Sequence, residues 1–176
     1  MGRGTTGAKA GAVAGILYGI LGAIFGIVVL TVEKSAIIST LNSYLASLSS
    51  TGISVSGITA NSLYNTEFIT EPVAAIVEGI IGGLILGAIF GIAVHRIPGR
   101  NDKVKGVAFG IILWLIFDVL LGLAGRTEFG NNYYALSVGL GIISVVVYGY
   151  VLGDLFGRWW HEPSEQTQQD SFKINQ

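Results

Sequence analysis

The chain alternates long apolar stretches with shorter polar ones, and this alternation is its most informative feature. A bilayer core takes about 20 residues of apolar helix. Four runs meet that length, at residues 10–32, 72–94, 106–124 and 134–157. We therefore predict an all-α integral membrane bundle of four transmembrane helices.

The connections between these runs are unequal in length. The longest is the polar outer loop 33–71, in which apolar residues recur at helical spacing: Ile37, Ile38, Leu41, Tyr44, Leu45 and Leu48. This pattern predicts an amphipathic extracytoplasmic helix between spans one and two. The alternating segment 53–58 predicts a short strand or an extended turn. Pro72 suits the first turn of the second span, where its missing N–H is no loss.

Polar segments flank the four spans. Residues 1–9 predict a short N-terminal tail, and residues 158–176 predict a polar C-terminal tail. The expected organisation is one transmembrane domain, residues 10–157, between two tails.

Glycine recurs at every fourth position in the second span, at Gly79, Gly83, Gly87 and Gly91. In lipid, helices associate through close packing, and small residues at this spacing let two backbones approach each other. We expect helix packing at this ladder and at the corresponding glycines of spans one and four: Gly15, Gly19, Gly22, Gly26, Gly149, Gly153 and Gly157. The partner helix lies either in the same chain or in another one. The alternative is a flexible or broken transport helix.

The distribution of charged residues along the chain is more informative than their sum. The net charge is −1, which gives no basic surface for nucleic acid. With both termini on one side, that side holds most of the basic residues: Arg3, Lys9, Arg96, Arg100, Lys103, Lys105, Arg158 and Lys173. The other side holds only Lys34 and Arg126. The positive-inside rule then predicts a multi-pass protein of the cell membrane with both termini in the cytoplasm. The composition is typical of a prokaryotic protein.

Two carboxylates fall inside the predicted spans, Glu78 and Asp118. A charged side chain at a helix centre costs about 2.5–3.5 kcal/mol on insertion scales, so such residues are functional candidates. Each lies six residues from the outer end of its span, about 9 Å deep. At equal depth they are a possible ion or proton site, with Glu33 and Glu71 above them as an acidic vestibule. The alternative is structural, with the acids hydrogen-bonded or with Asp118 neutralised by Arg126.

Two further residues have simpler interpretations. Arg158 follows Asp154 by four residues, which predicts an ion pair on one helix face. Trp114 lies mid-span without an obvious polar neighbour, which indicates packing or lipid contact.

The chemistry that the sequence lacks narrows the function. The chain has no cysteine and two histidines, which excludes disulfides and makes a multi-histidine metal centre improbable. We find no Ser–His–acid arrangement and no H-E-x-x-H motif, so we expect neither an enzyme nor a cofactor. The predicted function is that of a structural or accessory subunit, packing through its glycine faces with itself or with other membrane subunits in the lipid bilayer. The alternative is a small ion or solute transporter or channel using Glu78 and Asp118.

Overall fold

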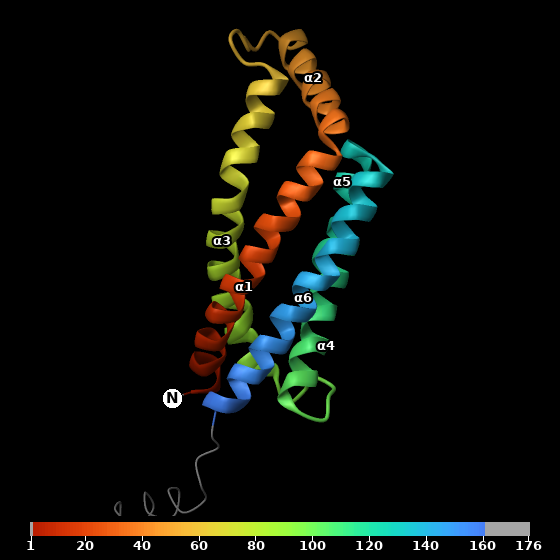
Figure 1. Ribbon diagram of the computed structural model, residues 1–176. Helices are drawn as coiled ribbons and strands as arrows, with labels where there is room; N and C mark the ends of the chain where they lie inside the picture. Colours follow the sequence, from red (N-terminus) through yellow and green to blue (C-terminus); the bar gives the residue numbers. More distant parts are fainter. Residues whose placement is uncertain (1, 161–176) are drawn as a thin grey trace, which may run out of the picture.

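The computed structural model describes residues 2–160, and nearly all of them are helical (Figure 1). In chain order the elements are α1 (Arg3–Val32), α2 (Lys34–Ser50), α3 (Ala60–Ala93), α4 (Asp102–Trp114), the π-helix η1 (Leu115–Leu121), α5 (Leu123–Phe129) and α6 (Asn131–Trp159). The described part of the chain contains no strand. Within residues 2–160, four helical segments are long and apolar enough to cross a membrane: α1, α3, the continuous segment from α4 to α5, and α6. The predicted all-α fold with four spans is confirmed.

The helices extend further than the hydropathy pattern indicates. α1 begins at Arg3, so most of the predicted N-terminal tail is helical. This first turn is supported by contact, because the backbone of Arg3 lies against Gly91 in α3. α6 ends at Trp159, and the rest of the predicted C-terminal tail, residues 161–176, lies outside the described residues.

α3 begins well before the predicted second span. A capping box starts it, in which Thr59 Oγ1 accepts a hydrogen bond from the Ser62 N–H at 3.0 Å and Ser62 Oγ accepts one from the Thr59 N–H at 3.0 Å. Pro72 therefore lies inside the helix, and its assignment to the first turn was wrong. Proline removes one backbone donor, and here the helix continues on both sides of it.

The long connection contains the predicted amphipathic helix, α2. It packs at the end of the molecule where α1 ends and α3 begins, through a buried cluster of Leu30, Ile37 and Tyr64. Tyr64 also donates its hydroxyl proton to the carbonyl of Leu30 at 3.0 Å. Residues 53–58 form an irregular loop rather than a strand.

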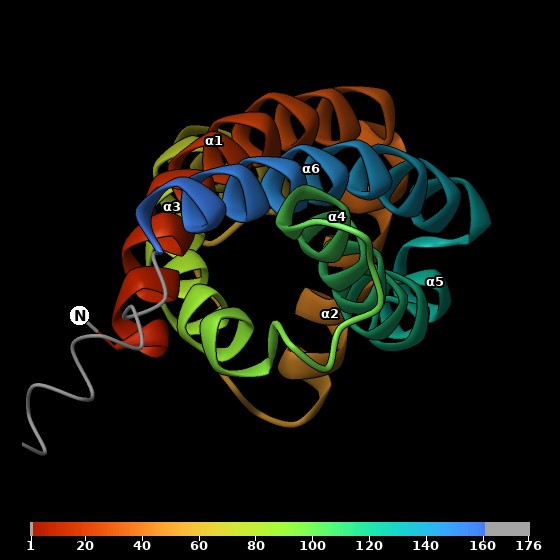
Figure 2. The same ribbon diagram turned by 90° about the horizontal axis from the view of Figure 1, so that it is seen from below.

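The four spanning segments follow the order α3–α1–α6–α4 around the molecule (Figure 2). α1 packs against both α3 and α6, and α6 packs against α4. α3 and α4 are therefore the two edges of this arrangement, although they are consecutive in the chain.

The glycine ladders join helices of the same chain. The ladder of α3 faces glycines of α1, and a Cβ atom added at Gly83 would lie 2.8 Å from the Gly15 Cα atom. A second contact of this kind joins α4 to α6, where a Cβ atom at Gly106 would lie 3.0 Å from the Gly153 Cα atom. The backbones touch at both seams, as the spacing allows in lipid.

Three of the glycines assigned to packing have different neighbours. A Cβ atom at Gly22 would meet only the Ala75 methyl, at 3.7 Å. At Gly26 it would meet Glu71 Oε1 at 2.7 Å, and at Gly157 it would meet Asp102 Oδ2 at 3.0 Å. Gly26 and Gly157 thus leave room for carboxylate groups rather than for a helix backbone.

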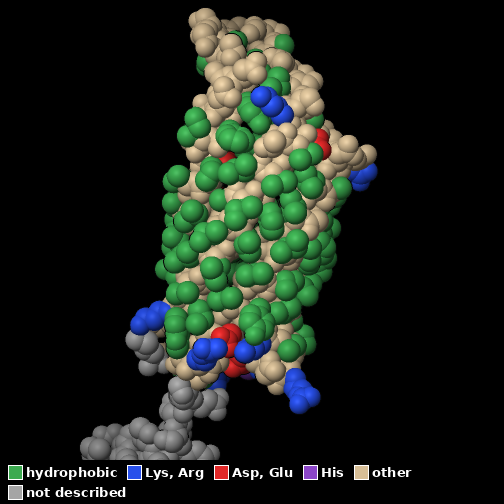
Figure 3. All heavy atoms as spheres, in the orientation of Figure 1, with side chains coloured by type: hydrophobic (Ala, Val, Ile, Leu, Met, Phe, Trp, Pro, Cys, Tyr) green, Lys and Arg blue, Asp and Glu red, His purple; other side chains and the backbone are tan. Residues whose placement is uncertain are grey.

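The outside of the molecule is divided into an apolar belt and two polar ends. Figure 3 shows hydrophobic side chains covering the middle of the face in view, with basic side chains near both ends. The start of α1, the 94–101 connection and the end of α6 lie together at the end opposite α2 (Figure 1). An apolar belt of this kind fits a lipid environment.

Candidate functional site

A cavity of about 460 Å³ lies between the two edge helices, α3 and α4. Its lining includes Tyr18, Glu78, Gly82, Leu86, Leu113, Phe117, Asp118, Val145 and Tyr148. Both carboxylates singled out from the sequence therefore border the same space. Glu78 reaches it from α3, and Asp118 reaches it from η1. Equal depth in the sequence pattern corresponds here to a shared site.

A second cavity of about 300 Å³ adjoins the first on the side of α2. The two cavities share Tyr18 and Asp118 as lining residues. Glu67 and Glu71 line the second cavity, together with residues of α1 and α6. Four carboxylates of the described residues, Glu67, Glu71, Glu78 and Asp118, thus border the two cavities and form an acidic route from the α2 end towards the middle of the bundle.

This acidic route was only partly predictable. Glu71 lies on it as expected, whereas Glu33 ends α1 and lines neither of the two cavities. Glu67 was missed because the segment before Pro72 was assigned to a loop. Once that segment is helical, Glu67, Glu71 and Glu78 fall on one face, since residues four and seven apart lie above one another.

The local backbone positions Asp118 in two ways. It lies within the π-helix η1, a wider helical form that is frequently found at functional sites. It also faces Gly141 of α6, where an added Cβ atom would overlap the carboxylate. The missing side chain at Gly141 therefore makes the room that Asp118 occupies.

Among the described residues, no basic side chain forms an ion pair with the cavity carboxylates. The ion pairs between described residues are those of Asp154, and none includes Glu67, Glu71, Glu78 or Asp118. Arg126 donates from Nε to Asn131 Oδ1 at 2.7 Å. The alternative in which Arg126 neutralises Asp118 is therefore not seen.

Two tyrosines from the central helices face the same cavity. Tyr18 of α1 and Tyr148 of α6 meet edge to face, with ring centroids 5.9 Å apart. The Tyr148 hydroxyl is buried and donates to the Gly83 carbonyl at 3.4 Å. A ladder glycine of α3 therefore also holds Tyr148 in place as part of the cavity wall.

Packed aromatic rings lie on the other side of the cavity from α2. Phe90 follows the lining residue Leu86 by one helical turn and is completely buried. Its ring centroid lies 5.5 Å from that of Phe109 in α4 and 5.4 Å from that of Phe156 in α6. These rings join α3, α4 and α6 below the cavity. The acidic route therefore lies between the α2 end and this cluster.

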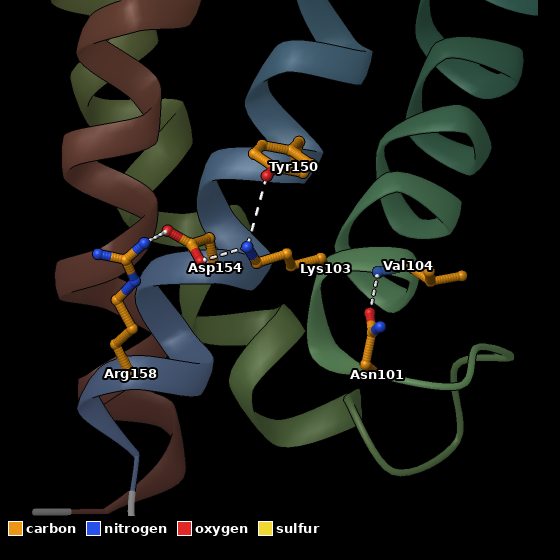
Figure 4. Close-up of polar contacts among 6 residues, drawn as sticks. All are labelled: Asn101, Lys103, Val104, Tyr150, Asp154 and Arg158. Carbon is orange, nitrogen blue, oxygen red and sulfur yellow. Dashed lines mark hydrogen bonds and ion pairs between the residues drawn. The ribbon is translucent and has the colours of Figure 1, made fainter.

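A polar network ties α4 to α6 beyond the aromatic cluster (Figure 4). Asp154 accepts from Arg158 at 2.8 Å and from Lys103 at 3.0 Å. Lys103 also donates to the Tyr150 hydroxyl at 3.4 Å. The predicted pair of Asp154 and Arg158 is confirmed, and Lys103 extends it to a second helix.

Trp114 has a polar partner that its sequence surroundings do not reveal. Its indole N–H donates to the Val138 carbonyl of α6 at 3.0 Å. The interpretation as packing or lipid contact alone was incomplete, because a backbone carbonyl on another helix leaves no trace in sequence spacing.

Among the described residues, no group of three or more His, Cys, Asp or Glu side chains has the arrangement of a metal site. The chemistry available at the cavity is therefore that of carboxylates and tyrosine hydroxyls within apolar walls.

Comparison with known proteins adds a family. Residues 8–167 match the family described as "Family of unknown function (DUF6789)". No curated protein and no solved structure matches the chain.

Proposed function

Since the chain belongs to the DUF6789 family, described as being of unknown function, we propose a role from its own geometry: it carries protons or small cationic solutes across a membrane. The observation that carries this proposal is the shared cavity of Glu78 and Asp118, which have no basic partner among the described residues. An ionised carboxylate at membrane depth is costly, and a bound proton or cation relieves that cost.

The shape of the acidic route supports transport over a purely structural role. Glu67 and Glu71 lie nearer the α2 end than Glu78 does, and the packed rings around Phe90 lie beyond it. A site with acidic side chains towards one end and packed rings towards the other fits one half of an alternating-access cycle. Transport then requires the two edge helices to separate at the rings and close above the acids.

The transport proposal is tested by flux in proteoliposomes. We expect Glu78→Gln and Asp118→Asn each to lower proton- or cation-coupled flux at least several-fold, while the variants still elute as the parent protein does. Glu128→Gln is the matched control, because it removes one carboxylate from exposed α5, away from both cavities. Flux that persists unchanged in the double variant of Glu78 and Asp118 would refute the proposal.

We also propose that both termini face the cytoplasm of a cell membrane and that α2 lies outside. The support is the excess of Lys and Arg at the end opposite α2. The chain has no cysteine, so in a single-cysteine variant the maleimide can label this protein only at the introduced residue. We expect a membrane-impermeant maleimide to label Ser50→Cys in intact cells, and Arg100→Cys only after lysis. The reverse pattern would invert the topology.

An accessory subunit is the second candidate, and the open edge between α3 and α4 favours it. The ladder glycines already contact each other within the chain, so a partner helix has to use another surface. That edge exposes large apolar side chains, including Ile81 and Phe117. This role predicts a stoichiometric partner in native extracts, detected by sizing and mass spectrometry. A chain that purifies alone and still transports would exclude it.

A further inference from the structure

The cavity between α3 and α4 combines apolar walls with two carboxylates. Leu86, Leu113 and Phe117 contribute apolar side chains, and Tyr18 and Tyr148 contribute aromatic rings. Ligand sites of this kind are largely apolar, with a few polar groups that set orientation. The polar side chains of this cavity are the carboxylates of Glu78 and Asp118 and the hydroxyls of Tyr18 and Tyr148, and none of them is basic.

The volume of the cavity favours an organic ligand over a bare ion. About 460 Å³ is within the range of roughly 300–1,000 Å³ seen for small-molecule sites. A hard metal cation needs about six oxygen ligands close around it. Two carboxylates on different helices and two tyrosine hydroxyls do not enclose an ion in that way. No described group of side chains has the arrangement of a metal site either.

The aromatic rings favour the same kind of ligand. A cation held over the face of a tyrosine or phenylalanine is attracted by the ring, and this attraction strengthens when water is excluded. Tyr18 and Asp118 stand together at the junction of the two cavities. A ligand there meets a ring and a carboxylate at once.

We propose that this cavity binds a hydrophobic organic cation, whose positive charge lies near Glu78 and Asp118 and whose apolar body lies against Leu86, Leu113 and Phe117. The inference rests on the proposed transport function and names its substrate class. Charge complementarity selects the occupant, because a lipid tail or an apolar helix would leave both carboxylates without a partner.

The test is equilibrium binding to the full chain in nanodiscs of zwitterionic lipid. Tetraphenylphosphonium is the probe, and tetraphenylborate, an anion of matching size and shape, is its control. We expect saturable binding of the cation alone. The double variant of Glu78→Gln and Asp118→Asn is expected to bind about tenfold more weakly or worse, as when a close charge pair is lost. Glu128→Gln is expected to bind as the parent does.

A second variant tests the location without altering charge. Gly82 lines the cavity, and nothing lies within 4 Å of a Cβ atom built there. Gly82→Leu should therefore fill the cavity without disturbing the helix contacts and should abolish binding. Gly139 of α6 has equally open surroundings but lines neither cavity, so Gly139→Leu is the matched control and should bind normally.

The outcomes separate this inference from the function it rests on. Equal binding of cation and anion would mean lipid-like occupation of the groove and would overturn the inference. Displacement of the probe by millimolar sodium would assign the site to an inorganic ion, with the same consequence. Absent probe binding, together with proton flux that still depends on Glu78 and Asp118, would overturn the substrate class alone. Loss of both would overturn the transport function as well.

Discussion

Two adjacent glycines of α3 provide a direct test of how the bundle is held together. Gly82 faces the cavity with open space around it, whereas Gly83 faces α1. An alanine at either position changes the helix propensity by the same amount, about 1 kcal/mol in favour of alanine. The difference between Gly82→Ala and Gly83→Ala therefore isolates packing between α1 and α3.

The size of that difference follows from the contact distances. A Cβ atom at Gly83 would lie 2.8 Å from the Gly15 Cα atom and would also overlap the Gly11 carbonyl oxygen. Carbon atoms prefer a separation of about 3.5–4.0 Å, so the helices must move apart by roughly 0.7 Å or more at this point. Overpacking of this kind costs about 1–3 kcal/mol. We expect Gly83→Ala to be less stable than Gly82→Ala by that amount.

The assay is thermal unfolding of the two variants in the same detergent, followed by sizing. At about 2–4 °C per kcal/mol for a chain of this size, the midpoints should differ by roughly 2–12 °C. Equal midpoints would refute the conclusion that the two backbones touch at Gly83.

Two further predictions concern the ends of the bundle. Tyr64→Phe removes the hydroxyl that donates to the Leu30 carbonyl, so we expect a loss of about 0.5–1.5 kcal/mol and faster hydrogen exchange at the start of α3; exchange identical to that of the parent protein would contradict a role for this bond. Asp154→Asn removes the negative charge that pairs with both Lys103 and Arg158, so we expect a small fall in the thermal midpoint that disappears at high salt. A fall of the same size at every salt concentration would point instead to lost packing.

The sequence contains enough information for the number of spans and for the glycine seams. Four apolar runs of sufficient length leave little choice of fold class, because lipid admits helices whose backbone groups are all bonded internally. The spacing of Gly79, Gly83, Gly87 and Gly91 likewise requires a close neighbour. It does not reveal which helix that neighbour is, since the same stripe serves contacts within one chain and between two.

The early start of α3 was hidden by its composition. Residues 60–71 include asparagine, threonine and glutamate, and this polar composition next to a hydrophobic span is typical of a loop. The capping box of Thr59 and Ser62 pairs two hydroxyl residues rather than a hydroxyl with Glu or Gln, so the usual signature did not apply. Pro72 then gave a misleading boundary.

The cavity itself could not be read from the sequence. Glu78 and Asp118 were identifiable as charged residues in apolar runs, but whether they line the same cavity depends on the order of the helices around the molecule. The π-helix around Asp118 and the room left by Gly141 depend on tertiary contacts as well. No spacing rule for single helices contains that information.

The unequal character of the seams has a mechanical consequence. α1 is fastened to α3, and α4 to α6, backbone against backbone. α1 and α6 meet by side chains such as Tyr18 and Tyr148. The molecule thus consists of two rigid helix pairs, and the contact between α1 and α6 acts as the hinge between them. A rotation of one pair relative to the other changes the separation of α3 and α4, where Glu78 and Asp118 lie.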